Sequence, residues 1–248
     1  MAITESSLTG GASTTNGTSF VTASITPTAG RLQLLSVHAN YASVSQATAP
    51  TLTITGNSLT WELITTIGFS TDGAGAWWSH VFLYRAMGTP STGTITIDSG
   101  ALVFDACGWT VTEYAGVSTT GTNGSGAIVQ SSTNSGAAAA SLTVTLSAFA
   151  STNNATYGTF ASDVLASTTF TPDSGFTELY DTGAGYSWVE TEWRNNNSTS
   201  VGTTPSASVN IGGIAVEIRA QVSGGLIMLS SDGGFLGKRN TIFVKVCR

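Results

Sequence analysis

One phrase occurs twice in this chain, and it constrains the fold more than any other feature. Residues 75–85 read GAWWSHVFLYR, and residues 185–194 read GYSWVETEWR. Each copy runs from a glycine through aromatic residues to an aromatic–arginine pair. A strand-like phrase repeated at long range predicts a repeated supersecondary unit, and units that cannot bury their apolar faces alone must share a core.

The repetition extends beyond this phrase. Residues 59–63 (LTWEL) are echoed by 176–179 (FTEL), and residues 107–114 (CGWTVTEY) by 211–218 (IGGIAVEI). We therefore place one copy at 20–117, a second at 140–221, and a connector at 118–136. The copies could form two separate sandwiches, or they could interleave as two halves of one double sheet. We favour one large sandwich with internal pseudo-symmetry.

Local patterning predicts strands throughout. Residues 51–55 (TLTIT), 94–97 (TITI) and 142–146 (LTVTL) alternate threonine with apolar side chains, as half-buried antiparallel strands do. No stretch carries a helical apolar stripe. The sequence thus predicts an all-β, antiparallel β-sandwich with an internal two-fold repeat. The Ser/Thr/Gly-rich residues 1–19 predict an N-terminal arm, and two strand-like runs around Asp-Gly-Gly predict a C-terminal hairpin at 222–248.

Charge is sparse and unevenly distributed. Only 9% of the 248 residues are charged and the net charge is −6, yet four of the eight basic residues lie within the last eleven positions. The remaining acidic body argues against a nucleic-acid-binding face, which needs clustered Lys and Arg. Two cysteines are too few for a disulfide framework. The chain shows no secretory signal and no membrane-spanning run, so we expect synthesis in a cytoplasm.

The second copy contains residues that resemble a known module. Residues 172–178 (PDSGFTE) and 213–219 (GIAVEIR) resemble a β-sandwich module of tailed-bacteriophage virion proteins and bacterial surface proteins. Its phrase joins a proline, a glycine, an aromatic residue and a threonine, followed by an Ala/Val-rich strand. The first copy departs from it, since residues 57–61 (NSLTW) lack the proline and glycine. The resemblance covers residues 20–221 and implies a jelly-roll-like sandwich with a structural or adhesive role, and it offers no catalytic residues to transfer.

Two functions follow as expectations. The first is a structural virion protein, for capsid decoration or the tail, that contacts copies of itself and other virion proteins. The alternative is a carbohydrate-binding adhesin or receptor-binding tail module that contacts host surface glycans. Both predict no enzyme, cofactor, metal, nucleic acid or membrane. The candidate interface or glycan-stacking residues are Trp77, Trp78, Trp188 and Trp193. The candidate assembly arm comprises Leu226, Ile227, Lys238, Arg239, Ile242, Phe243 and Lys245.

Other polar residues have ordinary explanations. His80 aligns with a tryptophan of the second copy, which favours packing, and no nucleophile elbow accompanies either histidine. Glu190 and Glu192 lie two apart on one strand face, where they could act as a glycosidase pair; we expect them on a solvated face. Asp72 and Asp181 could ligate calcium, but turn chemistry explains aspartate next to glycine.

Overall fold

The computed structural model describes residues 2–41, 46–72, 75, 77–164 and 167–222, and these residues are almost entirely β-structure. The strands of the first half are β1 (Thr4–Ser13), β2 (Ser19–Val21), β3 (Leu32–Tyr41), β4 (Thr53–Gly56), β5 (Glu62–Ser70), β6 (Trp78–Ala86), β7 (Ile95–Asp98) and β8 (Ala106–Ala115). Those of the second half, after the 3-10 turn η1 (Ser125–Ala127), are β9 (Ile128–Ala139), β10 (Leu142–Thr145), β11 (Ala155–Ser162), β12 (Phe170–Pro172), β13 (Thr177–Ala184), β14 (Ser187–Arg194), β15 (Ser200–Pro205) and β16 (Val209–Ile218). The prediction of an all-β antiparallel sandwich is confirmed.

The two halves have the same sheet orders. The first half forms a large sheet β1-β8-β3-β6-β5 and a small sheet β2-β7-β4. The second half forms a large sheet β9-β16-β11-β14-β13 and a small sheet β10-β15-β12, so each strand follows its counterpart by eight positions in chain order. Even a β-bulge coincides, because it interrupts β5 after Leu63 and β13 after Glu178.

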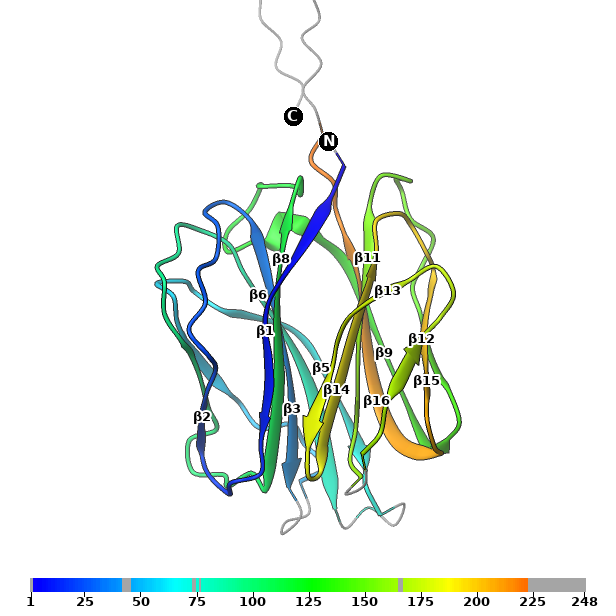
Figure 1. Ribbon diagram of the computed structural model, residues 1–248. Coiled ribbons are helices and arrows are strands. Elements are labelled where there is room, and N and C mark those ends of the chain that lie inside the picture. Colours follow the sequence, from blue (N-terminus) through cyan, green and yellow to red (C-terminus); the bar gives the residue numbers. More distant parts are fainter. Residues whose placement is uncertain (1, 42–45, 73–74, 76, 165–166, 223–248) are drawn as a thin grey trace, which may run out of the picture.

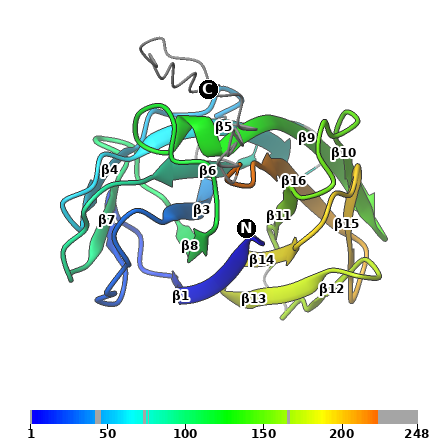
Figure 2. The ribbon, with the colours of Figure 1, turned by 90° about the horizontal axis from the view of Figure 1, so that it is seen from above.

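The four sheets stack as four layers (Figures 1 and 2). The two large sheets face each other in the centre, with β1 beside β13 and β5 beside β9. Each small sheet covers the outer face of its own large sheet. The structure combines the two arrangements considered from the sequence. Each half forms its own sandwich, and the halves also share a central core. β1 lies beside β13 on one side of the centre, and their counterparts β9 and β5 lie side by side on the other, as a pseudo-two-fold relation between the halves requires.

The central core is apolar at one end and polar at the other. Near the chain ends it contains Leu34, Tyr114, Tyr157 and Val216, all fully buried. Further along β3 the same face carries Ser36, whose hydroxyl hydrogen-bonds to the hydroxyl of Thr159 at 2.6 Å. These two residues occupy the middle strands β3 and β11, so their contact joins the halves at the centre of the molecule.

Residues 1–19 do not form the arm that their composition suggested. Thr4–Ser13 is strand β1, which pairs antiparallel with β8 along its whole length. The connector also shortens, because β9 begins at Ile128 rather than after Gly136. Both stretches are rich in small hydroxylated residues, and backbone pairing at a sheet edge holds them without an apolar side-chain pattern.

Both described chain ends lie at one pole of the body (Figure 1). Ala2 lies against Gly116, and the neighbouring Val117 forms a bridge with Ala220. The predicted C-terminal hairpin, with the whole candidate assembly arm, lies outside the described residues.

Candidate functional site

The repeated phrase closes two equivalent hairpins at the pole opposite the chain ends. In the first half the Trp78 indole nitrogen donates a hydrogen bond to the Gly75 carbonyl oxygen at 2.9 Å. In the second half Trp188 donates to the Gly185 carbonyl oxygen at 3.0 Å. Both glycines have a positive φ, of 79° and 58°, which explains why glycine recurs there. In each half, a tryptophan three residues after the turn glycine therefore closes the hairpin, although by strand register Trp188 matches His80 and not Trp78.

The four candidate tryptophans have different surroundings. Trp77 lies outside the strands and is 50% exposed, whereas Trp78 next to it is half-buried. Trp188 packs towards the core of the second sandwich, and Trp193 packs on the opposite face against Tyr114, with ring centroids 5.9 Å apart. Of the four, Trp77 alone offers a largely exposed ring.

Tyr186 was not among the predicted site residues. It occupies the two-residue turn between β13 and β14 and is 40% exposed. It follows Gly185, and the alignment of the repeated phrases had already placed an aromatic residue there. Trp77 and Tyr186 thus give each hairpin tip one exposed aromatic ring.

A pocket of about 200 Å³ opens at the seam between β5 and β9. Gly68, Phe69 and Ser70 line it from β5, Trp78 closes one side, and residues 135–137 (SGA) of β9 supply the rest. Both β5 and β9 are edge strands of their sheets, so each has one side without a ladder partner. The pocket therefore combines an aromatic side chain, small residues, hydroxyls and main-chain edges.

The equivalent seam, between β1 and β13, is closely packed at two points. A Cβ atom at Gly10 of β1 would lie 2.7 Å from the Tyr180 ring of β13, and one at Gly185 would lie 2.7 Å from the Thr14 methyl. At each of these two points a glycine backbone lies directly against a side chain of the other half. The two seams are therefore lined by different residues, although the strand orders are alike.

His38 forms a serine–histidine contact inside the central core. Its Nδ1 lies 2.8 Å from the Ser187 hydroxyl, and Nε2 has no hydrogen-bond partner. Burial lowers the pKa of His38 to about 3, so the ring is neutral. Both residues are fully buried. Among the described residues no carboxylate orients the ring, and the Ser187 hydroxyl is buried, so this pair lacks the geometry of a catalytic triad.

His80 is a packing residue in this structure. Its ring lies between Trp78 and Phe82, with centroid separations of 6.4 and 6.0 Å. Burial lowers its pKa to about 4. The residue is therefore a neutral member of an aromatic row along β6, as its alignment with a tryptophan suggested.

The expected solvated face of β14 does not exist. Glu190 and Glu192 are both fully buried and point into the sandwich of the second half. The reason is that the large sheet is covered on both faces. Successive side chains of β14 therefore point alternately into the central core and into the outer core of the second half, and neither face meets solvent. Without access to solvent the pair cannot act on a sugar.

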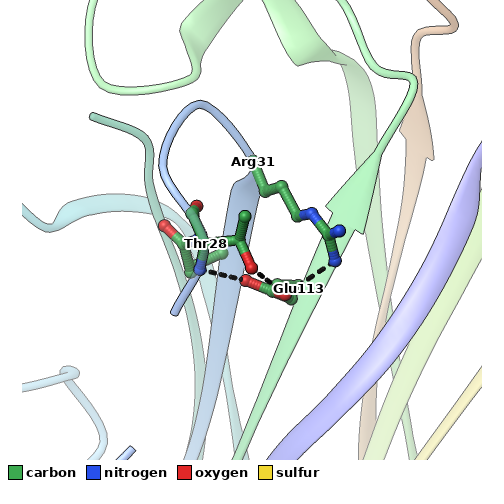
Figure 3. A network of polar contacts seen from close by, with 4 residues as sticks. Thr28, Arg31 and Glu113 are labelled. Atoms are coloured by element: carbon green, nitrogen blue, oxygen red, sulfur yellow. Dashed lines mark hydrogen bonds and ion pairs between the residues drawn. The ribbon is translucent and has the colours of Figure 1, made fainter. Parts of the chain in front are cut away.

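Two other buried glutamates are fully satisfied. Figure 3 shows Glu113, which accepts hydrogen bonds from the Thr28 amide at 2.7 Å and the Thr28 hydroxyl at 3.0 Å, and pairs with Arg31 at 2.8 Å. Its counterpart Glu217 accepts from Gln130 at 2.6 Å and Asn154 at 2.5 Å. Both tie strands to neighbouring loops, so they are structural anchors.

The two aspartates considered as calcium ligands differ, because Asp72 lies in the turn after β5, whereas Asp181 lies within strand β13 and not in the turn expected from the sequence. Asp72 accepts hydrogen bonds from the Ser70 hydroxyl and the Gly75 amide, both at 2.9 Å. Asp181 accepts from the Phe170 amide at 3.0 Å. Among the described residues no group of three or more His, Cys, Asp or Glu side chains is placed to hold a metal ion.

Comparisons with protein-family models, with curated proteins and with solved structures found no match. Within the part of the chain that the structure describes, no helix has the length and apolarity needed to cross a membrane.

Proposed function

We propose that this chain is a structural module of a tailed-bacteriophage virion, which works through contacts with copies of itself and with other virion proteins. The proposal keeps the expectation raised by residues 172–178 and 213–219. Its mechanism is the docking of a rigid block, with no catalytic step.

The observation that supports it most directly is the two-pole arrangement of the body. The described chain ends lie at one pole, and the β5–β6 and β13–β14 hairpins turn at the other (Figure 1). Trp77 and Tyr186 lie at these turns and are 50% and 40% exposed. Exposed aromatic rings are enriched at protein interfaces because they bury a large area at little entropic cost. A block with one pole for attachment and one for contact is suited to serial or layered assembly.

Light scattering of the purified full-length chain tests this proposal. We expect oligomers whose mass falls when Trp77 and Tyr186 are both replaced by alanine, or when the chain is ended after Gln221. Loss in the first case assigns the contact to the hairpin tips, and loss in the second assigns it to residues 222–248. A full-length chain that stays monomeric at every concentration contradicts self-assembly.

The pocket beside Trp78 supports a second candidate function, the binding of a host surface glycan. Its volume of about 200 Å³ suits a single sugar ring. An aromatic side chain can stack on the apolar face of a sugar, while the hydroxyls of Ser70 and Ser135 can pair with its polar edge.

A glycan screen followed by calorimetry tests this second candidate. We expect Ala137→Trp, which fills the pocket, to abolish binding of any glycan detected. The exposed substitution Thr143→Ala is the control, because it lies on the outer face of the second small sheet. Equal binding by both variants rejects the pocket as the site.

A further inference from the structure

Four carboxylates form a two-by-two array on neighbouring strands of the second half. In the antiparallel register of β13 and β14, Glu178 lies directly opposite Glu192, and Asp181 lies directly opposite Glu190. Paired residues in such a ladder point to the same side of the sheet. All four therefore project towards the second small sheet, β10-β15-β12, where Asp173 follows the end of β12.

Two members of this array are buried without hydrogen-bond partners. Glu190 and Glu192 have no exposed surface, and within the described residues none of their four carboxylate oxygens makes a well-formed hydrogen bond; the backbone of Gly202 only partly opposes the rise in the pKa of Glu192. This contrasts with Glu113 and Glu217, which are equally inaccessible but bonded on both oxygens. An unpaired buried carboxylate is costly when it is ionised.

The charged groups around the array do not neutralise it. Arg194 follows on the same strand, but its guanidinium lies over the Phe176 ring, 6.0 Å from the ring centre. Glu217 of β16 is held by Gln130 and Asn154. The remaining neighbours, Asp173, Glu178 and Asp181, are acidic. The described strands β10, β11 and β15 carry no charged side chain at all.

The local environment therefore favours the neutral acids. Burial, and then the negative charge of Asp173, raises the pKa of Glu192 to about 9. Burial, and then Glu192, raises the pKa of Glu190 well above its usual range. Two neutral carboxylic acids can sit where two carboxylates cannot, because the cost of desolvating a neutral group is far smaller.

The first half shows that this chemistry is not required by the fold. The bulges align Glu192 with Tyr84 and Glu190 with Phe82, and they align Glu178 with Leu63 and Asp181 with Thr66. The same four positions of the first half thus carry no carboxylate. The array is a feature of one half only.

We propose that Glu190 and Glu192 make closure of the second sandwich depend on protons: the neutral acids allow the sheet β10-β15-β12 to pack on β14, and their ionisation loosens that sheet while the first half stays closed. An acid that is harder to ionise when folded favours the open state as pH rises. Closure is therefore strongest below the ordinary glutamate pKa, and it weakens progressively up to the raised pKa values.

Hydrogen exchange read by mass spectrometry on the full chain tests the proposal between pH 5 and pH 8. Protection factors, which remove the intrinsic pH dependence of exchange, are compared for β10, β12 and β15 and for β2, β4 and β7. We expect protection of the second small sheet to fall about tenfold per pH unit for each glutamate that ionises on opening. The first small sheet should change much less.

Variants separate the array from other causes. Glu190→Gln with Glu192→Gln mimics the neutral acids and should remove the pH dependence. Glu62→Gln, an exposed glutamate of the first half, should leave it unchanged. If the double glutamine variant does not fold, Glu190→Phe with Glu192→Tyr, the residues of the first half, serves the same purpose. Three results would overturn the proposal. Protection of the second small sheet could be independent of pH, or protection could fall equally in both small sheets, or the fall with pH could persist in the folded double variant.

Discussion

The sheets around the two outer cores have the same strand orders, but the side chains inside the two cores differ in kind. Between the first large and small sheets, seven of the seventeen buried hydrophobic side chains that the structure describes are aromatic. Between the second pair of sheets they are mainly aliphatic and share the space with Glu190 and Glu192. The aromatic side chains of the first outer core are Phe20, Tyr41, Trp61, Phe82, Tyr84, Phe104 and Trp109. The comparison teaches that backbone pairing and alternation set the strand order, while individual core positions tolerate very different side chains.

The largest effect is expected when the two acids are placed at the matching positions of the first half. Replacing Phe82 and Tyr84 by glutamate removes two large apolar groups and buries two unpaired acids. We expect the free energy of unfolding at pH 7 to fall by about 5 kcal/mol or more. Urea denaturation measures it. Leu63→Glu, at the exposed position equivalent to Glu178, is the control and should cost under about 1 kcal/mol. If both variants lose the same free energy of unfolding, the buried positions of Phe82 and Tyr84 and the exposed position of Leu63 are contradicted.

The reverse exchange should stabilise the protein. Glu190→Phe with Glu192→Tyr replaces the buried acids by the apolar residues of the first half, and we expect a gain of about 2–4 kcal/mol at pH 7. The gain should shrink as the pH falls towards 4.5, because the wild-type acids then cost less. Urea denaturation at both pH values measures the difference. A gain that does not depend on pH would show that packing, rather than ionisation, distinguishes the two cores.

Two equivalent glycines, one in each half, should respond differently to the same substitution. Gly68 and Gly183 each lie beside the aromatic residue of the facing strand. A Cβ atom at Gly183 would meet backbone, including the Trp188 Cα at 2.7 Å, whereas one at Gly68 would meet only the His80 ring. We expect Gly183→Ala to cost about 3 kcal/mol and Gly68→Ala about 1 kcal/mol, since a ring can move and a backbone cannot. Thermal unfolding of both variants checks the order, and a reversed order would contradict it.

The smallest expected effect concerns the contact between the halves. Ser36→Ala or Thr159→Ala leaves one buried hydroxyl without its partner at the 2.6 Å contact and should cost about 1 kcal/mol. The double variant should cost less than the sum of the two single ones, because the same hydrogen bond is lost once. A double-mutant cycle by urea denaturation measures this coupling. Strict additivity would mean that the hydroxyls do not interact.

Alternation in the sequence predicted several strands of the small sheets correctly. Residues 51–55, 94–97 and 142–146 overlap strands β4, β7 and β10, whose apolar side chains face their large sheet. These strands have one solvated face, which is the condition under which period-two patterns are informative. The C-terminal prediction, by contrast, lies outside the described residues.

The same rule failed where a strand is covered on both sides. Residues 189–192 (VETE) alternate as a half-solvated strand would, but β14 lies between two cores. The available signal was the other copy, which has Phe82 and Tyr84 at the matching positions. Strand β1 was missed for a different reason, because main-chain pairing with β8 leaves no mark on its small, hydroxylated sequence.

The contact between Ser36 and Thr159 has a consequence for how such a molecule can change over generations. If two identical chains docked in this way, any substitution would appear on both sides, and an acidic array would have to be tolerated twice. Joining the halves in one polypeptide removes that constraint. One half can then keep a core rich in aromatic side chains and maintain the shape, while the other half is free to acquire costly ionisable groups.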